Sequence, residues 1–94
     1  MKHCILVKFK EDIRKDEQLY DDIFKLFNNC LSIEGITKVN LIKNCIERSN
    51  RYDLLIQIEM NKEALEAYDN CKWHKLWKEN YSDLLDKKAI FDYE

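Results

Sequence analysis

The sequence predicts an α+β fold in which four strands and two helical regions follow the order β-α-β-β-α-β. Two patterns indicate it: apolar residues alternate strictly along residues 51–60, and they recur at helical spacing along residues 14–31. The composition adds a third observation, because a chain with one glycine and no proline offers no flexible linker. We therefore expect the 94 residues to form a single domain, 1–94.

Four segments have the patterns of strands. Residues 1–10 carry apolar side chains at both odd and even positions, and a strand that is apolar on both faces is usually central in its sheet. Residues 36–46 and 51–60 flank a polar run at 47–50, which predicts the turn of a hairpin. Residues 87–93 supply the last strand.

The helical regions lie between these strands. Residues 14–31 form the first, and Gly35 follows at a position suited to a turn. Asn61 is placed to cap a short helix at 62–70, and residues 72–85 continue with helical periodicity. This order is the ferredoxin-like split arrangement, in which an antiparallel sheet carries its helices on one face.

The apolar content of the strands predicts a homodimer. A chain of this length buries only roughly 60–65% of the surface that its unfolded form exposes, so a partner subunit is a common remedy. The row Leu54-Ile56-Ile58 and the row His3-Ile5-Val7 are expected to exceed what so few helices cover. We therefore expect a second copy to place its sheet against the first and to enclose a barrel-like interior.

Composition excludes several classes of partner. The formal net charge of −2 lacks the basic excess of nucleic-acid binders, and no apolar run approaches the ~20 residues of a membrane span. The four cysteines are dispersed and no signal peptide precedes them, which favours free thiols in the cytoplasm.

Cys71 and His74 are spaced to share a metal, yet only His3 and Cys4 remain as further ligands. We expect no metal and no cofactor.

Four segments carry a resemblance that covers nearly the whole chain. They are Lys2-His3-x-Ile5-Leu6-x-Lys8-Phe9-Lys10, Glu47-Arg48-Ser49-x-x-Tyr52-Asp53-Leu54, Glu63-Ala64-Leu65-x-x-Tyr68 and Ile90-Phe91-Asp92-Tyr93. In this order and at these distances, the chain resembles the stress-responsive α/β barrel (Dabb) family, whose members are small dimeric ferredoxin-like proteins. The resemblance implies a dimeric α/β barrel, but it implies no particular substrate, because most members have no assigned reaction.

The chain is also similar to the olivetolic acid cyclase branch of that family, which closes a linear polyketide by an aldol step without a cofactor. The functional tyrosine and histidine of that branch match Tyr68 and His74, and one of its pocket histidines matches His3. The resemblance thus implies His74 as general base and Tyr68 as partner hydroxyl. The family segment His-Pro-x-His is replaced here by Cys71-Lys72-Trp73-His74.

Two features of the sequence modify this implication. Six residues separate Tyr68 from His74, so both reach one site only if the helix breaks near Cys71, where the proline is missing. Aromatic residues of the cyclase cavity are replaced by Asp22, Ile23 and Leu26, which indicates a different substrate.

Three interpretations of function remain. The leading one is a small-molecule-binding protein with an apolar pocket between sheet and helices. The second is a cofactor-free enzyme of cyclase, lyase or monooxygenase type. The third is a purely structural dimer whose cavity is closed and whose role is stability under stress. Each site residue also has an ordinary interpretation, with His74 at an interface or on the surface of a helix and Tyr68 and His3 in the core. The expected pocket-lining residues are His3, Ile5, Val7, Leu54, Ile56, Trp77 and Ile90.

Overall fold

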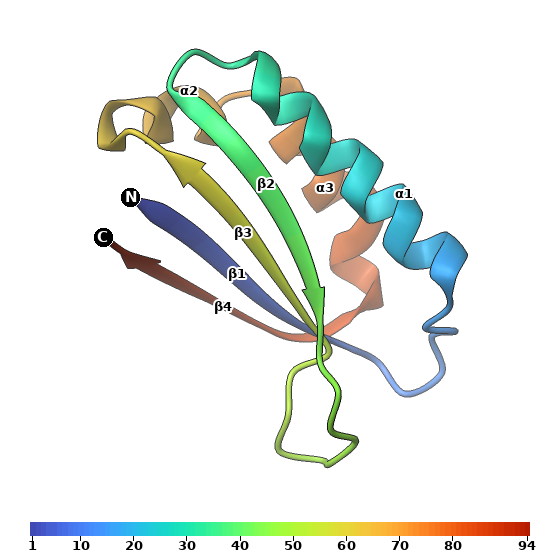
Figure 1. Cartoon of the computed structure of the whole chain (residues 1–94). Helices are drawn as coiled ribbons and strands as arrows, with labels where there is room; N and C mark the ends of the chain where they lie inside the picture. The colour runs from blue at the N-terminus through green and yellow to red at the C-terminus, as the bar shows by residue number, and fades with distance from the viewer.

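Helices cover one face of a four-stranded antiparallel sheet in the computed structural model, which describes all residues 1–94 (Figure 1). The strands are β1 (Lys2–Phe9), β2 (Ile36–Lys43), β3 (Leu54–Met60) and β4 (Leu85–Tyr93). The helices are α1 (Glu17–Asn28), α2 (Leu65–Asp69) and α3 (Lys72–Tyr81), with short 3-10 turns at Asn29–Ser32, Lys62–Ala64 and Ser82–Leu84. The predicted ferredoxin-like α+β fold is confirmed. None of the helices is long and apolar enough to cross a bilayer.

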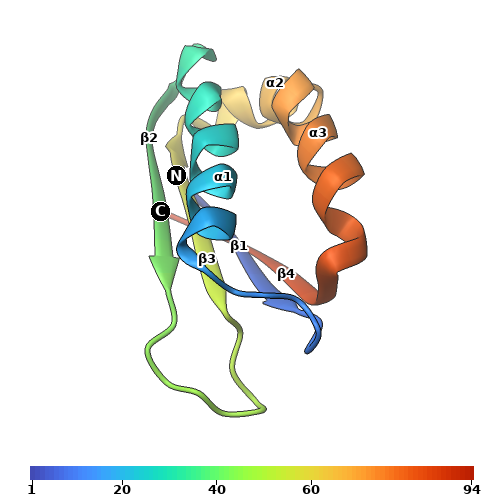
Figure 2. The same ribbon diagram turned by 90° about the vertical axis from the view of Figure 1, so that its right-hand side faces the viewer.

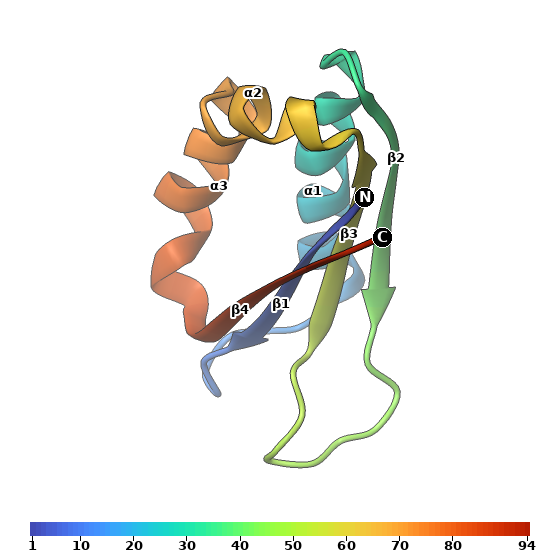
Figure 3. The same ribbon diagram turned by 90° about the vertical axis from the view of Figure 1, so that its left-hand side faces the viewer.

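The sheet has the strand order β2-β3-β1-β4, so β1 is central, as its two apolar faces predict. Ile5 of β1 lies opposite Ile56 of β3 on one side and opposite Ile90 of β4 on the other. Directly opposed residues of antiparallel strands project to the same face. The helices lie together on that face, as the two side views show (Figures 2 and 3).

Both apolar rows that were expected to exceed the reach of the helices are buried beneath them. Ile5, Val7, Leu54, Ile56 and Ile58 are each at most 1% exposed. The expectation is wrong because the two rows belong to neighbouring strands and point to the same face. They therefore form one continuous surface that the three helices cover.

The opposite face of the sheet is bare, and we call it the open face. By alternation along the strands, it carries Cys4, Leu6, Ile42, Leu55 and Phe91. Phe91 is 62% exposed and Ile42 is 47% exposed. β4 lies at one edge of the sheet, and none of its residues is buried.

The segment between β2 and β3 is a longer loop than the predicted turn at 47–50. The β2–β3 ladder ends at the pair Lys43–Leu54, whereas the sequence predicts strands at 36–46 and 51–60. The Asn44 side-chain amide donates to the carbonyl oxygens of Ile46 and Tyr52, each at 2.9 Å. These bonds fold the loop on itself. Only its two ends continue the sheet, because the Asn44 N–H donates to the Asp53 carbonyl at 3.0 Å and the Asp53 N–H donates to the Val7 carbonyl at 2.8 Å.

Two local features fix the entry of α1 and the turn after it. The Asp16 carboxylate accepts from the Leu19 amide at 3.0 Å and caps α1, whose Ile23 and Phe27 are buried against the sheet. Gly35 has a φ of +92°, and a Cβ there would lie 3.0 Å from the Cβ of Ala64, so both conformation and space require glycine. Asn61 precedes the next helical turn as predicted, but its side chain makes no capping hydrogen bond.

Candidate functional site

The predicted catalytic pair, Tyr68 and His74, and the predicted pocket-lining residue His3 form a continuous row of rings between the sheet and the helices. His3 lies on β1, Tyr68 on α2 and His74 on α3. The ring centroids of His3 and Tyr68 are 5.3 Å apart, and those of Tyr68 and His74 are 4.8 Å apart. The fold thus brings together residues that are far apart in the sequence, with Tyr68 in the middle.

The break in the helix that this row requires occurs at Cys71. α2 ends at Asp69 and α3 begins at Lys72, while Cys71 has an extended backbone with ψ of 159°. Its thiol accepts from the backbone N–H of His74 at 3.4 Å and caps α3. The extended cysteine therefore breaks the helix here without a proline.

The environment of His74 leaves one ring nitrogen free to accept a proton. Its Nδ1 lies 3.0 Å from the carbonyl oxygen of Asp69, and a carbonyl only accepts, so Nδ1 carries the hydrogen and Nε2 the lone pair. Burial lowers the pKa of His74, opposed by the bond to Asp69 and reinforced by Lys78 and Lys88. A neutral imidazole at pH 7 has the protonation state of a general base.

His3 is held by an acidic partner that the sequence analysis did not assign. Its Nδ1 lies 2.5 Å from Oδ1 of Asp92, and the two residues are directly opposite in the β1–β4 ladder. The carboxylate accepts, so Nδ1 of His3 carries the hydrogen in this pair. The sequence analysis places Asp92 in the final strand, and only the antiparallel register of that strand with the first puts Asp92 beside His3.

Tyr68 is the buried polar residue without a partner. Its side chain is 0% exposed, and its hydroxyl makes no hydrogen bond within the chain. Burial raises the pKa of Tyr68 well above its usual value, and the neighbouring thiols of Cys30 and Cys71 raise it further. The hydroxyl therefore stays protonated and is available as a donor.

The residues predicted to line a pocket do not all share one environment. Ile5, Val7, Leu54, Ile56 and Trp77 are packed in the hydrophobic core. Ile90 lies on the same face of the sheet as Ile5 but is 49% exposed, because the helices do not cover β4. A cavity of about 390 Å³ opens elsewhere, against Leu6, Ile42 and Leu55 of the open face.

A family model describes the domain to which these residues belong. The model of the stress responsive A/B barrel domain matches residues 1–94. The chain belongs to this family. No curated protein matches the sequence closely enough to count as a relative.

Solved structures agree with the Dabb assignment at the level of the fold. A dimeric protein of unknown function with a ferredoxin-like fold from Bacteroides fragilis is 20% identical with a TM-score of 0.78, over 99% of this chain and 93% of that one. A dimeric ferredoxin-like protein of unknown function from Thermobifida fusca is 11% identical with a TM-score of 0.78, over 98% and 87%. A hydroxynitrile lyase from Passiflora edulis is 9% identical with a TM-score of 0.75, over 98% and 89%.

Two cysteines of this Dabb domain, Cys30 and Cys71, contribute to packing beside the row. Cys30 is fully buried, and burial raises the pKa of its thiol, with Cys71 as its hydrogen-bonding neighbour. A thiol held protonated is a poor nucleophile. The fold also separates the four residues considered as metal ligands, Cys71, His74, His3 and Cys4. Cys4 projects to the open face, away from His3. No three metal-binding side chains are brought together.

Proposed function

We propose that this Dabb domain is a homodimer that binds a small, mostly apolar molecule beside His3, Tyr68 and His74. The observation that supports this most directly is the buried Tyr68 hydroxyl without a partner. A buried hydroxyl left unpaired costs about 1–3 kcal/mol, and an accepting atom of a ligand would recover that free energy. Pockets of binding proteins combine apolar walls with a few such polar groups.

The ligand would lie between the row and β4. Ile90 is exposed on the face of the sheet that carries His3 and Ile5, and it supplies an apolar wall next to the row. The Tyr68 hydroxyl offers one donor and Nε2 of His74 one acceptor. A carbonyl compound of modest size matches this pair of groups.

The exposure of β4 and of the open face supports the proposed dimer. β4 is an edge strand, and it exposes Ile90 on one face and Phe91 and Tyr93 on the other. Unpaired edges and exposed apolar rows are normally covered in stable proteins. The Bacteroides fragilis and Thermobifida fusca proteins are described as dimeric, which supports a second copy of this chain as the cover.

All four cysteines are free thiols, which supports a cytoplasmic location for this dimer. Dispersed free thiols persist where glutathione and thioredoxin keep them reduced. Fractionation of the cells that produce the protein would test this, and recovery from an extracellular or periplasmic fraction would contradict it.

A cofactor-free lyase or cyclase is the second candidate, and the state of His74 favours it. Its Nε2 would take a proton from the carbon next to a carbonyl group, while the Tyr68 hydroxyl would donate to the oxyanion that forms. The likeness to olivetolic acid cyclase segments supports this step, and so does the hydroxynitrile lyase of the same fold. Asp22, Ile23 and Leu26 still favour a substrate different from that of the cyclase.

Native mass spectrometry of the gently purified protein tests the leading proposal. The expected spectrum is a dimer that carries an extra mass per chain, and the same dimer without that mass in Tyr68→Phe. A dimer without any extra mass in the wild type, also after incubation with a library of small carbonyl compounds, would favour the purely structural role. Turnover of such a compound, lost in His74→Ala without loss of folding, would establish the enzyme instead.

A further inference from the structure

The helix-facing side of β4 carries a lysine next to the apolar wall of the proposed site. Lys88 lies directly opposite Val7 in the β1–β4 ladder, and Ile90 lies directly opposite Ile5. Directly opposed residues share a face, and Val7 and Ile5 are buried beneath the helices. Lys88 and Ile90 therefore project to the side of the sheet that holds the row of aromatic rings.

A second lysine comes to the same place from the helix. Lys78 lies four residues after His74 on α3, so the two side chains are neighbours on one face of that helix. The positive charges of Lys78 and Lys88 both lower the pKa of His74. One cation from the helix and one from the sheet thus act on the ring that is free to accept a proton.

Neither lysine has an anionic partner within the chain. The five ion pairs of the structure all use other groups. Asp92 is on the same side of β4, but it is bound to His3 and lies about 13 Å from Lys88 along the strand. The proposed site therefore has positive charge that the protein itself does not neutralise.

We propose that the ligand of this site is a keto acid and that Lys88, together with Lys78, binds its carboxylate. This assignment rests on the function proposed above, in which the Tyr68 hydroxyl donates to the carbonyl oxygen of the ligand. The apolar part of the ligand would lie against Ile90. Charge-assisted hydrogen bonds are stronger than neutral ones, so Lys88 is the residue that selects an acid over a neutral carbonyl compound.

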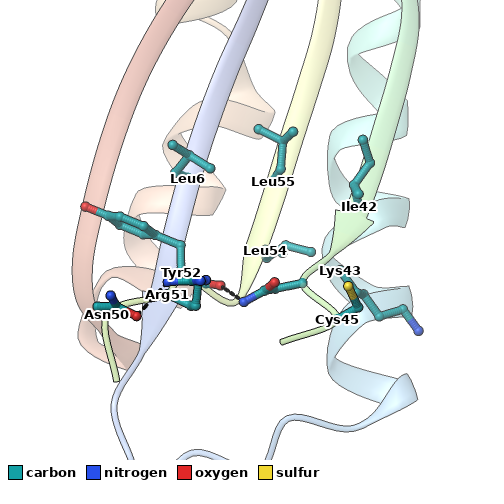
Figure 4. A pocket seen from close by; sticks show the side chains of 10 residues that line it. Leu6, Ile42, Lys43, Cys45, Asn50, Arg51, Tyr52, Leu54 and Leu55 are labelled. Atoms are coloured by element: carbon teal, nitrogen blue, oxygen red, sulfur yellow. Dashed lines mark hydrogen bonds between the residues drawn. The ribbon is translucent and has the colours of Figure 1, made fainter. Parts of the chain in front are cut away.

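The proposed dimer leaves this side of β4 accessible. The cavity of about 390 Å³ opens on the other side of the sheet, against Leu6, Ile42 and Leu55 (Figure 4). A second sheet packed on the open face would cover that cavity. Lys88 and Ile90 project away from it and are exposed, so a ligand reaches them in the dimer as well.

Calorimetric titration of the whole protein with benzoylpropionate, a keto acid with an apolar ring, tests the assignment. Its methyl ester is the matched probe without charge, and the acid is expected to bind roughly 10-fold or more tightly than the ester. Lys88→Gln should weaken the acid by a similar factor and leave the ester unchanged. Lys87→Gln removes the same charge from the neighbouring residue, which lies opposite Lys8 on the open face, and should change neither affinity.

Nuclear magnetic resonance titration of the His74 ring gives a second readout. Lys88→Gln should raise the pKa of His74 in the protein without ligand, because it removes a charge that lowers this pKa, and Lys87→Gln should not. Bound benzoylpropionate should raise the same pKa, and the bound ester should not.

The possible failures of the assignment and of the proposed function are distinguishable. Equal affinities for acid and ester, or equal effects of Lys88→Gln and Lys87→Gln on the acid, would overturn the assignment and leave the proposed function standing. If Tyr68→Phe binds both probes as tightly as the wild type, or if the wild type binds neither probe, both proposals fail.

Discussion

At the scale of single residues, the site is defined by which of its polar side chains has a hydrogen-bond partner. Asp92 orients His3, the Asp69 carbonyl orients His74, and Tyr68 between them has no partner. Stability alone would favour phenylalanine at position 68, because the ring packs and the hydroxyl gains nothing. Because buried polar groups without a partner are rare in folded proteins, this hydroxyl is a candidate functional group.

Tyr68→Phe should therefore be at least as stable as the wild type. It removes an unpaired buried hydroxyl without changing the shape of the ring, so the free energy of unfolding is expected to rise by about 1 kcal/mol. Urea unfolding at neutral pH measures this directly. Val39→Ala, which deletes buried methyl groups of β2, is a control that must be destabilising. A clear loss of stability in Tyr68→Phe would mean that the hydroxyl has a partner within the protein.

His74 should make the stability depend on pH in a defined direction. Burial lowers its pKa in the folded protein, so the unfolded chain takes up this proton at higher pH than the native state. The contribution is fully present above the ordinary value of about 6.5 and is lost as the pH falls towards the lowered pKa. The charges of Asp69, Lys78 and Lys88 also act on the pKa of His74, which Asp69 raises and the two lysines lower.

His74→Gln removes this proton uptake and serves as the measurement. Between about pH 7.5 and pH 5, the free energy of unfolding of the wild type should decline more steeply than that of the variant. Urea titrations at several pH values give both curves. Their difference removes the contributions of the titratable groups that the two proteins share. Curves that stay parallel over this interval would contradict the lowered pKa.

At the scale of elements, the helical region after β3 is interrupted between Tyr68 and His74, the two residues of the proposed site. The sequence predicts a short helix at 62–70 and helical periodicity at 72–85, and a break near Cys71 is a condition for bringing Tyr68 and His74 to one site. The structure supplies that break through an extended Cys71 whose thiol caps α3. Sulfur is a weak acceptor, so a capping cysteine is not evident from ordinary N-cap preferences.

Substitutions at Cys71 should separate capping from sulfur chemistry. Cys71→Ala removes the cap and is expected to destabilise the protein by roughly 1 kcal/mol, while Cys71→Ser keeps an acceptor and should be equal to or more stable than the wild type. Circular dichroism during thermal unfolding compares the three proteins. Equal destabilisation by alanine and serine would show that the thiol contributes by packing against Cys30 and not by capping.

Patterns in the sequence identify the elements better than their ends and their surroundings. Alternation placed Ile56 and Ile58 on one face of a strand, and the central position of β1 followed from its two apolar faces. The loop of residues 44–53 is longer than the predicted turn, and its Asn44 side chain bonds to the carbonyl oxygens of Ile46 and Tyr52, which local propensity does not reveal. The Asp92 partner of His3 depends on register between the two ends of the chain, which no local pattern contains.

At the scale of the whole molecule, the exposed surface of β4 is the largest departure from a self-sufficient domain. The helices bury the apolar rows of β1 and β3 but leave β4 uncovered on both faces. The expected dimer stays a prediction, but the rows named in support of it were the wrong ones, because the helices bury them. The residues that need the cover are Ile90, Phe91 and Tyr93.

Phe91→Asp should convert the proposed dimer into monomers. Phe91 is 62% exposed on the open face, and a carboxylate there would be buried without a partner if a second sheet packed against it. Light scattering coupled to size exclusion gives the mass of each variant at several concentrations. Leu31→Asp is the matched control, because Leu31 is 41% exposed on the 3-10 turn after α1, away from β4, and should leave the dimer intact. If Phe91→Asp stays dimeric, the second copy contacts another surface of the chain.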